Sequence, residues 1–195
     1  LHDALPISMW SGHLARLRRS AEWFGFPLDE QQLCRELGRQ PATGVWRIRM
    51  TLDSTGGIDI QATAMADAPP SARLAELADI RIDSGDPLRG HKTTERQLYD
   101  LALQGLPAES PVFDLVFVNE RGEIAEGARS NVFVERDGVL LTPPLTSGAL
   151  PGVLRAELLA TGRAREAVLY PADLGGDFWL GNALRGLIPV RLKPA

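Results

Sequence analysis

Two lysines occur in this chain of 195 residues, against nineteen arginines. One of them, Lys92, lies in "GDPLRGHKTTERQLYD" between a histidine and two threonines, and the other, Lys193, lies two residues from the C-terminus. A lysine that is partly withdrawn from water has a lowered pKa, and its neutral amine can attack a carbonyl carbon. Lys92 is therefore a candidate for Schiff-base chemistry. The alternative interpretation is that Lys92 is a solvated surface residue at the start of a helix.

A candidate carboxylate follows in "EIAEGARSNVFV", residues 123–134. Glu126 is placed between two predicted strands, and the small residues Gly127 and Ala128 after it allow close backbone approach. A carboxylate at such a place suits the pyridinium nitrogen of pyridoxal phosphate, because the ion pair strengthens the electron sink of the ring. An exposed loop glutamate beside Arg121 or Arg129 is the alternative.

Three other segments hold groups that suit a phosphate. In "TSGALPGVLRAELL", residues 146–159, a glycine-containing turn feeds a helix whose first N–H groups and dipole attract anions. Asn182, in "WLGNALRGLIPV", has an amide that can donate to a phosphate oxygen. Arg16, one turn after His13, has a guanidinium suited to bidentate binding. Each segment taken singly also fits a bland interpretation: an ordinary helix start, a turn, or an exposed helix arginine.

The elements around these candidates follow from hydrophobic spacing and turn residues. In the first third we predict a helix that Gly25 and Pro27 end, a second helix capped by Asp29 and ending near Gly38, and a hairpin around "DSTGG". We then predict a strand at 78–83 and a helix over 93–104 capped by Thr93 or Thr94, so that Lys92 falls where strand gives way to helix.

The remaining segments mix strands and helices. We predict three or four strands over 113–144, a helix over 150–162 opened by Pro151 and Gly152, and late strands within 167–174 and 177–192. Many of the predicted turns connect antiparallel strands, and helices occur between the strands. We therefore expect the fold class to be α+β or α/β.

Composition narrows the class of protein. Apolar residues make up 44% of the chain, which predicts a packed interior, and the net charge of −4 gives no basic footprint for nucleic acid. Apolar runs fall short of the roughly 20 residues that span a bilayer. The single thiol, Cys34, excludes an internal disulfide and a multi-cysteine zinc site. We expect a cytoplasmic protein without a metal, acting on a small molecule.

The chain opens on "LHDALPIS", without methionine, a basic start or a long apolar stretch. This pattern differs from a signal peptide, and we expect the chain to begin inside a longer protein.

The order of the motifs is similar to that of a known family. HLxRL, a lysine, EGxxSN, TPPLxSGxLPGVxR and GNxLRGLxPV follow one another over roughly residues 11–192 and resemble the class IV, fold-type IV enzymes that use pyridoxal 5'-phosphate. The resemblance implies a D-amino-acid aminotransferase-like fold of two lobes. We expect a small N-terminal lobe at 9–68, incomplete at its start, a connector at 69–79, and a large cofactor-binding lobe at 80–195.

The resemblance also implies a role for each candidate. Lys92 would hold the cofactor covalently and then move protons, and Glu126 would pair with the ring nitrogen. The phosphate would be held by Arg16, Asn182 and the backbone at Gly152 and Val153. Ser130 and Asn131 would lie beside the ring, and Arg49 would receive a substrate carboxylate, although Arg47 points to the same face of the strand.

One position departs from the transaminase pattern. Transaminases of the family place a tyrosine shortly after the lysine, near the cofactor's phenolic oxygen, where this chain has Gln97. Tyr99 lies too far along the predicted helix to be taken as its substitute.

Within the family, "HKTTERQLYD" and "NALRGLIPV" are most similar to the lyase half that is fused behind aminodeoxychorismate synthase component I. The expected activity is conversion of 4-amino-4-deoxychorismate to 4-aminobenzoate and pyruvate, a step of folate biosynthesis. The alternatives are an aminotransferase for branched-chain or D-amino acids and an inactive fragment of such an enzyme. The family implies a homodimer, and a synthase domain is possible in the full-length protein.

Overall fold

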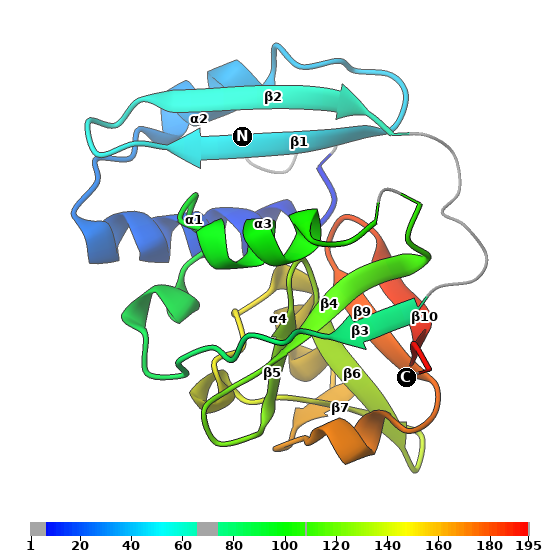
Figure 1. The fold of residues 1–195 in the computed structure, drawn as a ribbon. Helices are drawn as coiled ribbons and strands as arrows, with labels where there is room; N and C mark the ends of the chain where they lie inside the picture. Colours follow the sequence, from blue (N-terminus) through cyan, green and yellow to red (C-terminus); the bar gives the residue numbers. More distant parts are fainter. Residues whose placement is uncertain (1–6, 66–73, 108, 195) are drawn as a thin grey trace. The chain divides into compact units, whose positions relative to one another are not determined.

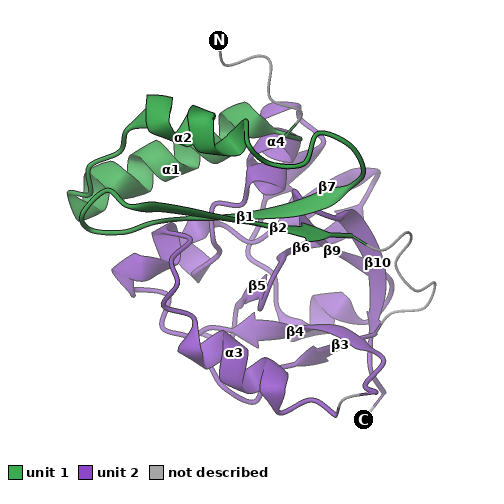
Figure 2. Ribbon diagram, turned by 90° about the horizontal axis from the view of Figure 1, so that it is seen from above, with its two compact units in different colours: residues 1–69 green, residues 70–195 purple. Residues whose placement is uncertain are grey.

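The computed structural model describes residues 7–65, 74–107 and 109–194. The chain divides into two compact units, Leu1–Pro69 and Pro70–Ala195 (Figure 2). Each unit has an apolar core of its own, so each is described by itself. Most of the opening segment and the first part of the predicted connector fall outside the described residues.

Over residues 7–65, unit 1 consists of two helices and a hairpin, as the sequence predicts. Its elements are α1 (Trp10–Phe24), α2 (Glu30–Leu37), β1 (Trp46–Leu52) and β2 (Ile58–Ala64). α1 ends at Gly25, whose φ of 68° lies in the left-handed region that glycine tolerates. Asp29 caps α2 through a hydrogen bond of 2.9 Å from the backbone N–H three residues on. The Asp53 carboxylate accepts the N–H groups of Thr55 and Gly57, which closes the predicted turn.

One face of the hairpin packs with the apolar faces of both helices. The apolar residues gathered there are Trp10, Leu14, Leu33, Leu37, Ile48, Met50, Ile58 and Ile60. Because successive side chains of a strand point to opposite faces, Arg47 and Arg49 lie together on the exposed face of β1. The sequence prediction for this pair is confirmed as far as their shared face.

Unit 2 is built on one eight-stranded mixed sheet with the order β5-β4-β3-β10-β9-β6-β7-β8 (Figure 1). The strands are β3 (Leu74–Leu77), β4 (Val112–Val118), β5 (Ile124–Gly127), β6 (Asn131–Arg136), β7 (Val139–Thr142), β8 (Ala164–Glu166), β9 (Phe178–Asn182) and β10 (Gly186–Leu192). Parallel pairs join β3 to β4 and β10, and β7 to β8. β4 is buried along almost its whole length, which explains its nearly continuous apolar run.

In the described part of unit 2, two α-helices and three short 3-10 helices accompany the sheet. They are α3 (Gln97–Gln104), α4 (Val153–Ala160), η1 (Pro87–Gly90), η2 (Leu145–Ser147) and η3 (Pro171–Leu174). α3 packs on β4 through Tyr99 and Phe117, and α4 packs near β6 and β8 through Leu158 and Phe133. Where three or four strands are predicted over 113–144, the structure has four, β4 to β7, and the predicted helix opened by Pro151 and Gly152 is confirmed as α4.

The predicted start of the helix after Lys92 is wrong. α3 begins at Gln97, with Arg96 as its N-cap and no side-chain cap. Thr93 does not cap the helix, because its hydroxyl faces the carbonyl oxygen of Glu95 at 3.4 Å. Lys92 therefore lies in a loop between η1 and α3, rather than at a junction of strand and helix.

Two strand positions also differ from the prediction. The strand expected at 78–83 lies at Leu74–Leu77, inside the stretch expected as a connector, where it fills the place between β4 and β10. Within 78–83 only Ile82 forms a bridge, to Asn119, and the residues at 79–81 are exposed. In 167–174, Pro171 begins a 3-10 helix, and the strand lies earlier, at β8.

Candidate functional site

Glu126 is a buried carboxylate whose two oxygens are both hydrogen-bonded. It is the third residue of β5 and is 6% exposed. Its Oε1 accepts a hydrogen bond from the Tyr99 hydroxyl, and its Oε2 accepts one of 3.0 Å from the backbone N–H of Leu150. A carboxylate has about four acceptor positions, so capacity remains for another donor. The alternative of an exposed loop glutamate is excluded by this burial.

Burial raises the pKa of Glu126, because a charged carboxylate is costly away from water. Four groups oppose this effect and favour the ionised form: the Tyr99 hydroxyl, the Leu150 N–H, Arg89 and Lys92. Lys92 is therefore close enough to Glu126 for its charge to act on the carboxyl group. The two central candidates of the sequence therefore lie in the same unit, and the charge of one acts on the other.

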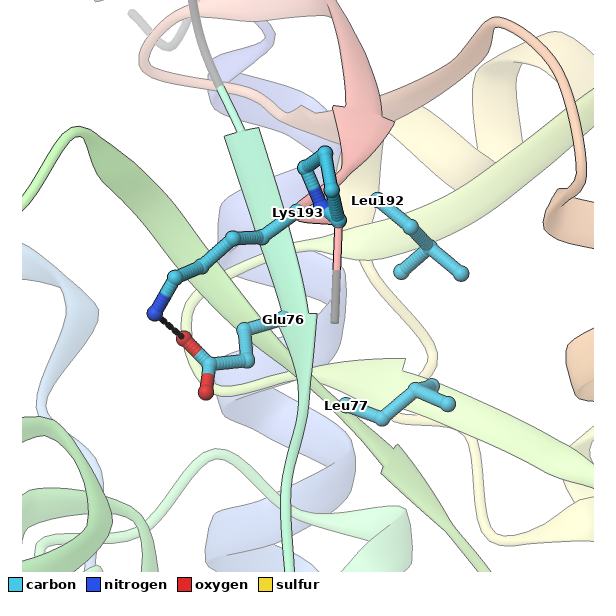
Figure 3. Close-up of a pocket in the computed structure, with 5 residues that line it drawn as sticks. Glu76, Leu77, Leu192 and Lys193 are labelled. Carbon is cyan, nitrogen blue, oxygen red and sulfur yellow. Dashed lines mark hydrogen bonds and ion pairs between the residues drawn. The ribbon is translucent and has the colours of Figure 1, made fainter.

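The two lysines differ in their surroundings. Lys92 is exposed in its loop, rather than half-buried as Schiff-base chemistry suggested. Lys193 pairs with Glu76 at 3.2 Å in a shallow pocket near the C-terminus, lined also by Leu77, Leu192 and Pro194 (Figure 3). None of the predicted site residues lines that pocket, and an exposed ion pair of this kind stabilises little. Of the two lysines, Lys92 is therefore the candidate for the chemistry predicted from the sequence.

The segment before α4 connects Glu126 to Asn131. Leu150 gives its N–H to Glu126, and its carbonyl oxygen accepts the Asn131 amide at 2.9 Å and the Gly152 N–H at 2.8 Å. A Cβ at Gly152 would overlap Oδ1 of Asn131, so only glycine fits there. Val153 is the first residue of α4, and the first N–H groups of a helix have no partner within it.

Asn182 and Asn131 lie on neighbouring strands. β6 pairs with β9 so that Asn131 faces Gly181, and Asn182 follows at the end of β9. The Asn182 amide nitrogen donates to the carbonyl oxygen of Arg129 at 3.1 Å, and its oxygen accepts two backbone N–H groups of the next turn. The side chain thus holds two loops together, and one amide hydrogen is left for a phosphate.

Ser130 is held by a buried residue that the sequence analysis missed. Asp114 of β4 is fully buried and accepts the Ser130 hydroxyl at 2.7 Å and the Arg129 N–H at 3.0 Å. Burial raises the pKa of Asp114, and the bonds from Ser130 and Arg129 oppose that rise. The lone acidic residue in "FDLVFV" was the signal, because a carboxylate within a buried strand requires partners.

Tyr99 and Arg89 are further residues that sequence reasoning did not place in the site. The sequence places Tyr99 too far along the predicted helix, but α3 starts four residues later than predicted, and the Tyr99 hydroxyl donates to Glu126. Arg89, in η1, donates to the Tyr99 hydroxyl.

Arg16 and Arg49 belong to unit 1. Arg16 is half-buried on α1, and Arg49 is exposed on β1. Their proposed contacts with phosphate and substrate remain predictions. Among the residues that the structure describes, no group of three or more His, Cys, Asp or Glu side chains is arranged to hold a metal, and no helix has the length and apolar character to cross a membrane.

The residues of unit 2 fit pyridoxal phosphate. An exposed amine, a buried carboxylate with capacity for a further donor, and the first N–H groups of the helix α4 match its aldehyde, ring nitrogen and phosphate. The site forms at the β5 edge, the start of β6, the end of β9 and the start of α4.

Comparison with known proteins places this fold in the class of fold-type IV enzymes. A solved structure from Mesorhizobium loti, described as a "Putative amino-acid aminotransferase", superposes with a TM-score of 0.90 at 40% identity, covering 95% of this chain and 92% of that one. Among curated relatives, a "Putative aminodeoxychorismate lyase" of Schizosaccharomyces pombe is 28% identical over 85% of this chain and 73% of its own length. A "Probable branched-chain-amino-acid aminotransferase" of Thermotoga maritima is 23% identical, over 92% and 70%.

The family model for amino-transferase class IV matches residues 5–192. The chain belongs to this family, and it is an enzyme whose cofactor is pyridoxal 5'-phosphate.

Proposed function

We propose that the chain is a lyase that converts 4-amino-4-deoxychorismate to 4-aminobenzoate and pyruvate. The observation that carries this proposal is the Lys92 amine acting on the buried, doubly hydrogen-bonded Glu126. When bound, pyridoxal phosphate supplies an aldehyde that holds the substrate nitrogen and a ring that accepts an electron pair. Support for a lyase over a transaminase comes from Gln97 at the tyrosine position and from the late Gly181-Asn182-Ala183 run.

In the proposed reaction, Lys92 is the acid and base. Its neutral amine removes the proton from the ring carbon that bears the substrate nitrogen. The bond between the neighbouring ring carbon and the ether oxygen then breaks, which leaves an aromatic ring and the enolate of pyruvate. The proton that Lys92 removed balances the one that the enolate carbon gains on becoming pyruvate. Aromatisation drives the reaction, so the protein has mainly to orient the reactants.

The other side chains bind and orient. Glu126 holds the ring nitrogen in its protonated form, and Asn131 and Ser130 fix the loop beside it. The phosphate is assigned to the Gly152 and Val153 backbone, Asn182 and Arg16, and a substrate carboxylate to Arg49. We also infer that the protein is cytoplasmic and that it forms a homodimer. Light scattering of the purified chain tests the oligomeric state.

The chain offers a clean test of the lysine. The purified protein is incubated with pyridoxal phosphate, reduced with borohydride, digested and mapped by mass spectrometry. We expect the adduct on Lys92, its loss in Lys92→Ala, and its retention in the matched control Lys193→Ala. Labelling of Lys193 instead, or equal labelling of both lysines, would contradict the assignment.

A second candidate function is amino-group transfer. The 40% identity to the Mesorhizobium loti structure along most of both chains favours it. The two activities differ in product. A lyase releases pyruvate from 4-amino-4-deoxychorismate without a second substrate, whereas a transaminase yields a 2-oxo acid matching its amino donor. Release of pyruvate from 4-amino-4-deoxychorismate that disappears in Lys92→Ala supports the lyase. If the only product is the 2-oxo acid that matches an amino donor, the aminotransferase replaces the lyase as the proposed function.

A further inference from the structure

Glu126 is ionised only if its surroundings offset its burial. A buried carboxylate tends to take up a proton, and a protonated carboxyl group cannot form an ion pair with a pyridinium nitrogen. The Lys92 charge favours ionisation in the absence of cofactor, but Lys92 is also the residue proposed to react. A second, unreactive source of positive charge is therefore needed.

Tyr99 and Arg89 provide that source as a chain of hydrogen bonds. The Arg89 guanidinium donates to the Tyr99 hydroxyl oxygen, and the same hydroxyl donates its hydrogen to Oε1 of Glu126. Hydrogen bonds in series polarise one another, so a cation behind the hydroxyl makes it a stronger donor. Desolvation first, and then the charge of Glu126, raise the pKa of Tyr99, so the hydroxyl keeps the hydrogen that it donates.

The side chains that form this series of hydrogen bonds are held in place by packing. Tyr99 is 8% exposed, and its ring meets the fully buried Phe117 edge-on at 4.9 Å between centroids. Arg89 lies in η1, which ends at Gly90, and Lys92 follows two residues after that end. Asp86 also forms an ion pair with Arg89, but its Oδ2 lies 3.6 Å from Nε, beyond hydrogen-bond length, whereas the guanidinium donates directly to the Tyr99 hydroxyl.

We propose that Tyr99 and Arg89 are positioning residues that keep Glu126 ionised and oriented toward the ring nitrogen of the cofactor. This inference rests on the proposed role of Glu126. It assigns Tyr99 to the nitrogen side of the ring, whereas the tyrosine that transaminases place shortly after the lysine serves the phenolic oxygen. Arg89 acts through Tyr99 and needs no contact with the cofactor.

The test measures the titration of Glu126 itself, in the full chain without added cofactor. The protein is labelled with ¹³C at the glutamate carboxyl carbon, and Glu126→Gln assigns the signal. We expect Tyr99→Phe, which removes only the hydroxyl, to raise the titration midpoint by about one pH unit. Arg89→Gln should raise it in the same direction by less.

Two control variants test whether the effect is specific to the hydrogen bonds from Arg89 through Tyr99 to Glu126. Arg96 lies as close to the Tyr99 ring as Arg89 does, 5.1 Å against 5.4 Å from the centroid, but its guanidinium donates to the Ala128 carbonyl oxygen. Arg96→Gln should therefore leave the midpoint within about 0.3 units of the parent. Tyr170→Phe, at a half-exposed ring, should also leave it unchanged.

An unchanged midpoint in either Tyr99→Phe or Arg89→Gln overturns the proposal, and so does an equal rise in Arg96→Gln. If Tyr99→Phe does not fold, Arg89→Gln decides alone. Failure of the proposed function is seen separately, as loss of the adduct at Lys92, because the titration requires no cofactor.

Discussion

At the scale of the residue, the chemistry depends on Glu126 being a carboxylate rather than on its shape. Glu126→Gln keeps the size of the side chain and can still accept from Tyr99, but its neutral amide cannot stabilise a protonated ring nitrogen. We expect the variant to retain bound cofactor and to lose at least about tenfold in turnover, the change that 1.4 kcal/mol produces. Steady-state kinetics with the cofactor absorbance as a loading control measures this. Turnover equal to that of the parent would remove Glu126 from the role.

Residue types and motif order predicted Lys92, Glu126 and Asn131, but the partners of Glu126 were not predictable. The Tyr99 hydroxyl and the Leu150 N–H reach it from 27 and 24 residues away in the chain. The tyrosine contact depends on where α3 begins, and an error of one helical turn directs the tyrosine elsewhere.

At the scale of the element, the start of α4 has the tightest packing requirement. Gly152→Ala would push a methyl group into Oδ1 of Asn131 and disturb the Leu150 segment that contacts Glu126. We expect a loss of about 1–3 kcal/mol in the free energy of unfolding and weaker cofactor binding. Denaturant unfolding and a cofactor titration measure the two effects.

Gly176→Ala is the matched control for that change. A Cβ at Gly176 would meet no atom within 4 Å, so its stability and cofactor affinity should equal those of the parent. Equal behaviour of the two alanine variants would show that the close approach at Gly152 is not required.

The elements were largely predictable where hydrophobic period and capping residues agree. α1, α2, the hairpin and the strands over 113–144 have both signals. β3 and the start of α3 were misplaced because local signals conflicted. Thr93 resembles a cap, but its hydroxyl bonds to the Glu95 carbonyl oxygen, and β3 is defined by its neighbours β4 and β10.

At the scale of the whole molecule, acid should weaken unit 2 through Glu123. Its carboxylate accepts Arg121 at 2.8 Å, Asn119 at 2.9 Å and Ser147 at 2.7 Å, which ties η2 to the turn between β4 and β5. The Arg121 bond first, then those of Asn119 and Ser147, lower the pKa of Glu123 from 4.5 to about 2. Because the folded pKa is depressed, this stabilisation is present above pH 4.5 and is lost as the pH falls toward 2.

Glu123→Gln should therefore lower stability at pH 7 and flatten the decline in stability between pH 4.5 and 2. Urea unfolding at several pH values measures both. Glu135→Gln removes a carboxylate from an exposed position of β6 and serves as the charge control. A parallel decline in Glu123→Gln and the parent would mean that other carboxylates cause the acid sensitivity.

The sequence by itself determined the family, the mixed fold and the identity of the candidate lysine and carboxylate, because these depend on residue types and their order along the chain. Only the tertiary structure decided that Glu126 is buried, that Lys92 is exposed yet acts on it, and that Arg89 and Tyr99 stand behind it. Burial and hydrogen bonding between distant segments arise from packing of the sheet and helices, and no local pattern in the chain encodes them.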